Sequence, residues 1–199
     1  MSAGLLEARV IPVLPEYKKD QIVIPELKII RRMKEMARPL ATIYKDKNLL
    51  MVGLLTGCYM VMSDLGKALW EEGLHDMEQD FMVVGSYGDR TESSGHLDIK
   101  SDMKTNPKER HILIVDDVAD TRLTLAGIHQ LMLDRGAMSV ASFVLVNKQV
   151  AKPLVQYEPT YSAFITPRIW LEGKGMDSAG KGRANPNVIV GMDYPNGVK

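Results

Sequence analysis

Three aspartates follow a run of apolar residues in the stretch HILIVDDVADTRLTL, residues 111–125. Asp116 and Asp117 come directly after the apolar run, and Asp120 follows three residues later. Because like charges this close repel each other, we expect them to recruit a cation or a hydroxyl-rich ligand. A structural reading stays open, in which two acids end a strand and Asp120 caps a helix, since aspartate is a favoured N-cap residue.

The hydrophobic pattern predicts the elements that carry these acids. Strands are predicted at 49–56, 80–87, 111–117 and 138–148, and helices at 26–47, 59–72 and 121–135. Pro39 is expected to kink or divide the first helix. Alternating strands and helices favour an α/β fold with a central, mainly parallel sheet flanked by helices. Ligands of such sheets bind beyond the carboxyl ends of the strands, where the three aspartates fall.

Composition narrows the class of protein. The 199 residues suit one domain, and 25 basic against 25 acidic residues give no indication of nucleic-acid or membrane binding. Cys58 is the only cysteine, which excludes a disulfide framework and a cysteine-based metal site. The first residues lack a signal-peptide pattern, and no apolar run is long enough to span a membrane. We therefore expect a cytoplasmic protein.

Two classes of protein end a strand with paired acids in this way. ILIVDDVADTRLTL resembles the opening of a response-regulator receiver domain, in which such acids bind Mg²⁺. That class places this strand first and needs a phosphoacceptor aspartate at the end of a later apolar strand. Residues 145–164, where it would fall, contain no aspartate. The receiver class is therefore disfavoured.

The second class is the type I phosphoribosyltransferases. Their signature is an apolar strand, two acids, two small or apolar residues, Asp-Thr or Asp-Ser, Gly, any residue and Thr. DDVADTRLT, residues 116–124, resembles this signature, with Arg122 in place of the usual glycine. The resemblance implies that Asp116 and Asp117 accept hydrogen bonds from ribose hydroxyls. It also implies that a 5′-phosphate is held by backbone N–H groups and threonine hydroxyls of Thr121, Arg122, Leu123 and Thr124.

Further segments resemble the hypoxanthine–guanine (6-oxopurine) branch of this family, in the same order along residues 49–183. VGLLTGCYMVMSDLGKAL (52–69) resembles its first strand and pyrophosphate loop, and DFMVVGSYGDRTESSGHLDIKSDM (80–103) resembles its catalytic loop. LVNK (145–148) and IWLEGKGMD (169–177) resemble its purine-binding and metal-binding segments. Five ordered segments are more specific than any one of them.

The resemblance implies a role for individual residues near the reacting groups. Asp120 is implied as the acid/base near purine N7. Ser86 and Tyr87 are implied as catalytic residues on a loop, 86–104, that closes and excludes water. Pyrophosphate is expected to contact Thr56, Gly57 and Arg183, with a cis peptide bond at Thr56–Gly57.

The purine and metal contacts follow from the same resemblance. Lys148 is expected to donate to the purine O6, Trp170 to stack on the base, and Leu171 to lie beside it. Asp177 is expected to bind Mg²⁺, with Asp116 and Asp117 as further ligands through water. Ordinary structural roles stay open for these residues: a solvated lysine, a core tryptophan and, at Arg183, a surface charge.

Departures from the family pattern leave the choice of purine open. Asn147 precedes Lys148 where an acid or a second lysine is common, and Glu172 and Lys174 fall near the presumed purine edge. For Arg122, we expect a position that contacts or borders the 5′-phosphate, and its guanidinium could reach the phosphate if its backbone angles are ordinary.

The whole chain, 1–199, is predicted to form one phosphoribosyltransferase domain. Its core is expected at about 26–150, with a small hood from about 1–25 and 151–199. The implied reaction takes phosphoribosyl pyrophosphate and a purine base to a nucleoside monophosphate and pyrophosphate, with Mg²⁺ as cofactor. A non-catalytic, nucleotide-sensing relative is the alternative. The resemblance also implies a homodimer or homotetramer.

Overall fold

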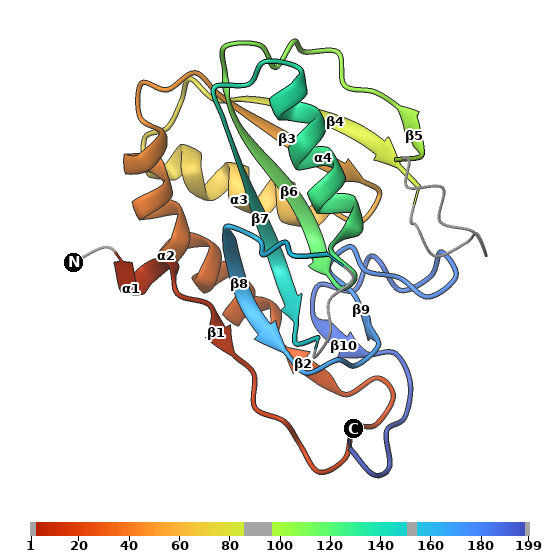
Figure 1. Ribbon diagram of the computed structural model, residues 1–199. Helices are drawn as coiled ribbons and strands as arrows, with labels where there is room; N and C mark the ends of the chain where they lie inside the picture. Colours follow the sequence, from red (N-terminus) through yellow and green to blue (C-terminus); the bar gives the residue numbers. More distant parts are fainter. Residues whose placement is uncertain (1–2, 86–96, 151–154, 198–199) are drawn as a thin grey trace.

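A central sheet of seven strands organises the protein, in the order β1-β8-β7-β6-β3-β4-β5 (Figure 1). The computed structural model describes residues 3–85, 97–150 and 155–197. Neighbouring strands run parallel, except that β5 is antiparallel to β4. The strands are β1 (Arg9–Val10), β3 (Leu49–Leu55), β4 (Glu78–Val84), β5 (Ile99–Ser101), β6 (His111–Ala119), β7 (Ser139–Lys148) and β8 (Tyr161–Thr166). The predicted α/β fold with a mainly parallel sheet is confirmed.

Helices cover both faces of this sheet (Figure 1). The long helices are α2 (Glu26–Tyr44), α3 (Tyr59–Glu71) and α4 (Leu123–Asp134), and α1 (Ala3–Leu6) is short. In β3, Leu49 and Met51 pack in the cluster with α2 and α3, whereas Leu50 and Val52 pack in the cluster with α4. This alternation follows from the two-residue repeat of a strand, and it explains why the strand is apolar throughout.

The chain changes direction across the sheet between β3 and β6. From β3 it passes through α3 to β4, and from β6 it passes through α4 to β7, on the opposite side. The loops that leave the carboxyl ends of β3 and β6 therefore diverge and leave a crevice between them. This is where Asp116 and Asp117 lie.

A small second sheet joins the two ends of the chain. Its order is β2-β10-β9, formed by β2 (Ile22–Ile24), β9 (Leu171–Glu172) and β10 (Val188–Val190), with antiparallel pairing. This matches the predicted hood of N- and C-terminal segments. The structure places β1 and β8 in the large sheet, however, although both fall in ranges expected for the hood. Phe164 of β8 is fully buried in the main core, and the burial of this large apolar side chain favours the place of β8 in the large sheet.

Two helices differ from the sequence prediction. Helix α2 runs through Pro39 without a break and ends at Tyr44, three residues early. Pro39 is buried, and packing along α2 outweighs the local cost of a proline, about 3 kcal/mol. Helix α4 begins at Leu123 instead of Thr121, because Arg122 has left-handed backbone angles that no right-handed helix accepts.

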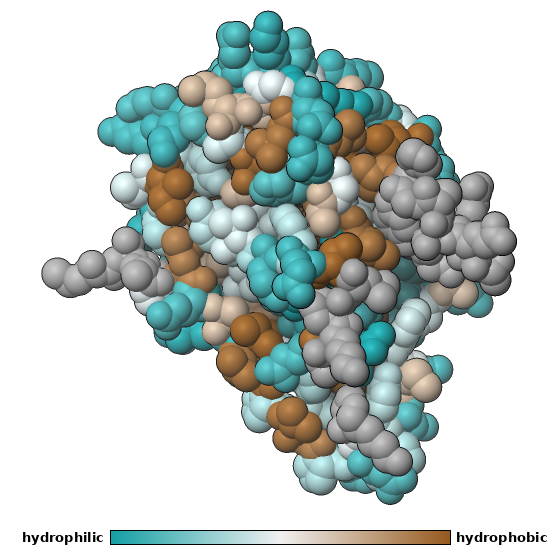
Figure 2. Space-filling model, viewed as in Figure 1, coloured by the Kyte–Doolittle hydropathy of each residue, from teal (hydrophilic) through white to brown (hydrophobic). Residues whose placement is uncertain are grey.

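The face drawn in Figure 2 carries hydrophobic side chains in separate groups among hydrophilic ones. Within the described ranges, no helix combines the length and the apolar character that crossing a membrane requires.

Candidate active site

A cavity of about 530 Å³ opens at the carboxyl ends of β3, β6 and β7. The loop that follows β8 closes its far side. The cavity lies at the point where the chain reverses its direction across the sheet, the usual ligand position in such folds. Its lining residues are Leu54, Leu55, Thr56, Gly57, Val84, Gly85, Asp116, Asp117, Val118, Asp120, Thr121, Thr124, Lys148, Trp170, Leu171, Met176, Asp177 and Arg183.

The turn after β3 forms one wall of the cavity. Thr56 and Gly57 lie there, and the cis peptide bond joins Leu55 to Thr56. The predicted position, Thr56–Gly57, was therefore wrong by one residue. The strand was predicted to end at residue 56, but β3 ends at Leu55, so the turn begins one residue earlier than expected.

Three segments meet at Gly57 without room for a side chain. A Cβ atom on Gly57 would lie 2.3 Å from Oδ2 of Asp117. A Cβ on Gly175 would lie 1.8 Å from the carbonyl oxygen of Gly57. The backbone of the turn after β3 thus lies against the Asp117 carboxylate and against the backbone of the 173–177 loop, at distances that only glycine permits.

Of the paired acids at the end of β6, Asp116 is half-buried and Asp117 is buried. Asp117 is 7% exposed. Burial raises the pKa of Asp116 well above its usual range, and the neighbouring Asp117 raises it further. Burial also raises the pKa of Asp117, although a hydrogen bond with Asp116 and the charge of Arg183 oppose this shift. The protein therefore holds this pair at a cost in stability, as expected for groups kept for a ligand.

This cost predicts a pH-dependent gain in stability for Asp116→Asn. Between the ordinary aspartate pKa, about 3.9, and the raised pKa of the folded pair, the native state binds more protons than the unfolded chain. The folded protein therefore loses stability as pH rises through that window. Asp116→Asn removes one charge and keeps an acceptor for the Asp117 N–H.

We expect Asp116→Asn to raise Tm at pH 8 by at least about 2–4 °C, the shift that corresponds to roughly 1 kcal/mol in a chain of this size. Calorimetry of wild type and variant at pH 5 and pH 8 measures this, with exposed Asp76→Asn as the control. A lower Tm for Asp116→Asn at pH 8 would contradict the account.

Asp120 and Lys148 form an ion pair inside the cavity. Nζ of Lys148 donates to Oδ2 of Asp120 at 2.9 Å, and it lies 5.8 Å from the ring centre of Trp170. Oδ1 of Asp120 is buried and accepts no hydrogen bond from the described residues. Nε of Arg168 lies 3.8 Å from this oxygen. Lys148, Asp120 and Trp170 thus present a cation, a carboxylate and a flat aromatic face side by side.

The loop between β6 and α4 contributes Thr121 to the cavity, and the first turn of α4 contributes Thr124. Arg122 has φ 65° and ψ −1°, the left-handed conformation that the glycine of the family adopts most easily. Its guanidinium pairs with Glu158 and Asn147 and does not line the cavity. Leu123, the first residue of α4, does not line it either. The expected contact of the Arg122 side chain with a phosphate is therefore not supported, and Arg122 borders the cavity only through its neighbour Thr121.

A short loop after β9 places a carboxylate and a guanidinium opposite Asp117. Nη2 of Arg183 lies 2.7 Å from Oδ1 of Asp177, and Nη1 donates to the carbonyl of Gly175 at 2.6 Å. The N–H of Gly180 donates to Oδ2 of Asp177 at 2.6 Å. Both side chains are therefore held in fixed positions at the cavity wall.

Trp170 is oriented by a hydrogen-bonded chain. Its indole Nε1 donates to Oγ of Ser178 at 2.5 Å, and that hydroxyl donates to Glu172. Lys174 points elsewhere: it is 2% exposed and its Nζ lies 2.7 Å from Asp64 of α3. Of the two residues expected near the purine edge, Glu172 thus supports Trp170, and Lys174 anchors the loop to α3.

Comparison with known proteins agrees with this geometry. A family model described as phosphoribosyl transferase domain matches residues 23–170. The hypoxanthine-guanine phosphoribosyltransferase of Dictyostelium discoideum is 32% identical over 167 residues, which cover 83% of this chain and 92% of that protein. The chain belongs to the hypoxanthine–guanine phosphoribosyltransferase family.

Two further relatives show how the phosphoribosyltransferase unit recurs. The bifunctional protein TilS/HprT of Listeria monocytogenes is 33% identical over 171 residues, 86% of this chain but only 26% of that protein. A variant of the hypoxanthine phosphoribosyltransferase of Trypanosoma cruzi, solved with its product IMP, has a TM-score of 0.79 and 28% identity. That match covers 86% of this chain and 91% of the other. The protein is accordingly an enzyme of the phosphoribosyltransferase class.

Most residues implied by the resemblance line the same phosphoribosyltransferase cavity. These are Thr56, Gly57, Asp116, Asp117, Asp120, Thr121, Thr124, Lys148, Trp170, Leu171, Asp177 and Arg183. Ser86 and Tyr87 lie outside the described residues.

Sequence reasoning missed Arg168, Ser178 and Met176. Arg168 and Ser178 lie in irregular segments whose side-chain directions no periodicity predicts.

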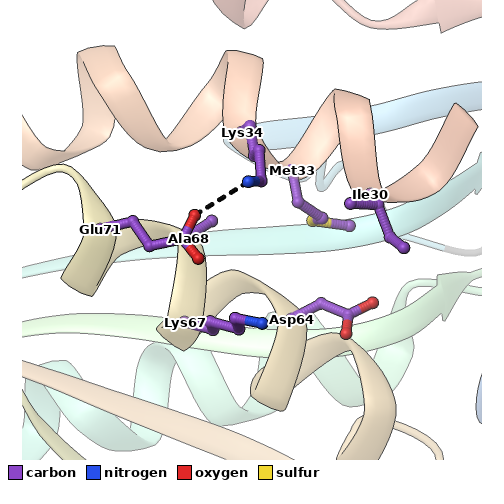
Figure 3. Close-up of a pocket in the computed structure, with 7 residues that line it drawn as sticks. All are labelled: Ile30, Met33, Lys34, Asp64, Lys67, Ala68 and Glu71. Carbon is purple, nitrogen blue, oxygen red and sulfur yellow. Dashed lines mark ion pairs between the residues drawn. The ribbon is translucent and has the colours of Figure 1, made fainter. Parts of the chain in front are cut away.

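A second, smaller cavity lies between α2 and α3 (Figure 3). Its volume is about 150 Å³, and its lining residues come from these two helices alone. Lys34 of α2 and Glu71 of α3 form an ion pair across it at 3.0 Å. It receives no residue from the carboxyl ends of the strands, so it is a groove between packed helices and no part of the phosphoribosyltransferase site.

Proposed function

We propose that this enzyme transfers the 5-phosphoribosyl group from phosphoribosyl pyrophosphate to N9 of a 6-oxopurine in purine salvage. The observation that carries the proposal is the group formed by Lys148, Asp120 and Trp170. A 6-oxopurine presents an oxygen at C6 beside N7. The lysine has only donors, which suits the oxygen, and the carboxylate accepts, which suits a protonated N7. The indole face supplies a stacking surface.

The rest of the cavity suits the other substrate. The N-terminus of α4, with the hydroxyls of Thr121 and Thr124, is a site for the 5′-phosphate. Asp116 and Asp117 accept hydrogen bonds from the ribose hydroxyls, which relieves part of the cost of their burial. The turn at Thr56–Gly57 and the guanidinium of Arg183 face the position of the pyrophosphate.

Proton movement follows from the same groups. A neutral base must lose a proton as N9 becomes bonded to ribose, and the carboxylate of Asp120, which lines the cavity, accepts it from N7. Lys148 turns from Asp120 to the purine oxygen, where its charge stabilises the negative charge that develops on the base. Arg168, 3.8 Å from Asp120, remains near the carboxylate.

The residues also fit a magnesium requirement. Among the described residues, no group of three or more His, Cys, Asp or Glu is arranged to hold a metal alone. Mg²⁺ commonly binds through one or two carboxylates, water and substrate phosphates. Asp177 supplies such a carboxylate, and Asp116 and Asp117 supply further oxygens through water. When bound, the ion would neutralise the charge of the leaving pyrophosphate.

The proposal extends to the surroundings of the enzyme. The substrates are phosphoribosyl pyrophosphate and a purine base, and the products are a nucleoside monophosphate and pyrophosphate. A cytoplasmic homodimer or homotetramer stays a prediction. The presence of only one cysteine supports a reducing compartment, and sedimentation equilibrium measures the oligomer.

An assay with four bases tests the proposed function. Purified enzyme, phosphoribosyl pyrophosphate and Mg²⁺ are incubated with hypoxanthine, guanine, xanthine or adenine, and nucleotides are separated by chromatography. We expect product from at least one 6-oxopurine, and a kcat/KM for adenine lower by roughly 10²-fold or more, since its amino group leaves Lys148 unpaired. Chelation of Mg²⁺ is expected to stop turnover. Binding of nucleotide without turnover of any base would replace the proposal with a nucleotide-sensing role.

A further inference from the structure

Arg122 occupies a backbone conformation that favours glycine. Its φ of 65° places it in the left-handed region, directly before the first residue of α4. An arginine stays there only if its surroundings hold it, because the Cβ atom disfavours this region. The contacts of its side chain show what holds it.

The guanidinium of Arg122 joins three parts of the chain. It forms an ion pair with Glu158, in the connection between β7 and β8. Its Nη2 donates to Oδ1 of Asn147 in β7 at 3.2 Å. The Arg122 side chain is 6% exposed, whereas the Glu158 side chain is 67% exposed. Of the two partners, Arg122 is therefore the buried one. It belongs to the loop that, under the proposed function, must hold a fixed shape to bind the phosphate.

This contact lies beside the ion pair of the catalytic groups. Asn147 and Lys148 are adjacent in β7, and they hold Arg122 and Asp120 of the loop respectively. Under the proposed function Lys148 leaves Asp120 when it turns to the purine oxygen. Among the described contacts, the hydrogen bond between Arg122 and Asn147 is then the remaining side-chain contact between this loop and β7.

We propose that Arg122 is a positioning residue that fixes the 121–124 loop for binding of the sugar 5′-phosphate, acting through Glu158 and Asn147. It does not contact the phosphate itself. Glu158 holds the guanidinium outside the cavity. The identity of this phosphate site rests on the proposed function.

Binding of ribose 5-phosphate tests this role without any need for turnover. Calorimetric titration compares wild type with Arg122→Ala, Glu158→Ala and the double variant, and pyrophosphate is titrated as a second ligand. We expect each single variant to weaken ribose 5-phosphate binding by roughly 5- to 50-fold, the effect of losing a charged hydrogen bond. The double variant is expected to bind no more weakly than Arg122→Ala, because both changes remove one contact. Pyrophosphate affinity is expected to stay within about 2-fold.

Further variants separate positioning from folding. Arg122→Lys keeps the pair with Glu158 and is expected to recover part of the affinity. Glu71→Ala, which removes another acid of an ion pair far from the loop, is the control. Glu158→Ala leaves the sequence of the loop unchanged. If Arg122→Ala does not fold, ribose 5-phosphate binding by Glu158→Ala therefore tests the inference instead. In steady-state assays the variants should raise KM for phosphoribosyl pyrophosphate more than they lower kcat.

Two results would overturn the inference. Unchanged ribose 5-phosphate binding in Glu158→Ala would show that the Arg122–Glu158 ion pair does not position the loop. Tighter binding in Glu158→Ala would show that Glu158 keeps Arg122 from acting as a direct phosphate ligand. Wild type that binds ribose 5-phosphate but makes no nucleotide would contradict the proposed function and leave this inference standing.

Discussion

Replacing Asp120 with asparagine is expected to lower kcat by roughly 10²- to 10⁴-fold, the usual contribution of a positioned acid/base. The side chain of Asp120 lines the cavity that also holds Lys148 and Trp170, and its Oδ2 accepts a hydrogen bond from Lys148. Asparagine has nearly the same volume but cannot take up a proton. KM for phosphoribosyl pyrophosphate is expected to change little, because the phosphate is assigned to Thr121 and Thr124 and the pyrophosphate to the Thr56–Gly57 turn and Arg183, and not to the side chain of Asp120.

The control for this variant must separate chemistry from stability. Asp120→Asn leaves Lys148, which is 7% exposed, without its carboxylate partner, and an unpaired buried charge destabilises a fold. Thermal unfolding therefore accompanies the kinetics. Exposed Asp76→Asn is the matched substitution and should retain wild-type turnover. A folded Asp120→Asn enzyme with wild-type kcat would remove the acid/base role.

Replacing Gly175 with alanine is expected to lower kcat/KM by about 10²-fold or more, the effect of moving reacting groups by about 1 Å. The new Cβ would lie 1.8 Å from the carbonyl oxygen of Gly57. Carbon and oxygen approach no closer than about 3.3 Å even in favourable contacts, so one of two loops must shift by more than 1 Å. One carries Asp177, and the other is the turn at Thr56–Gly57 that faces the pyrophosphate position.

Gly180→Ala is the matched control for this substitution. Gly180 lies in the same loop and has φ +82°, close to the +105° of Gly175, but its Cβ would meet nothing within 4 Å. It therefore carries the backbone strain, about 1–2 kcal/mol, without the collision. We expect Gly180→Ala to lose some stability and to keep activity within about 3-fold. Equal activity of the two variants would show that the contact at Gly57 is not needed.

The sequence predicted the parts of the site that depend on order along the chain. The apolar runs at 49–56 and 111–117 are strands because burial on both sides of a parallel sheet requires such runs. The carboxyl ends of parallel strands lie at the same edge of a sheet, which indicated where Asp116 and Asp117 fall. The place of Gly57 in the same cavity was implied by the family resemblance, and the structure brings the three residues together.

The sequence did not predict contacts between distant side chains. Arg122 and Glu158 are separated by 36 positions, and neither lies in a repeating pattern. No repeating pattern predicts the left-handed angles of Arg122 either, so the start of α4 was misplaced as well. The course of β8 was missed for a similar reason: a short apolar segment shows no preference between the hood and the large sheet.

The central claim is that one cavity holds the phosphate, the ribose and the base of the nucleotide product. A crystal structure of the enzyme with inosine 5′-monophosphate tests it most directly. We predict the 5′-phosphate within hydrogen-bonding distance of Thr121 and Thr124, and the ribose hydroxyls facing Asp116 and Asp117. The base should lie against Trp170, with Lys148 on its oxygen. A nucleotide bound elsewhere, or one whose base points away from Lys148, would contradict the account.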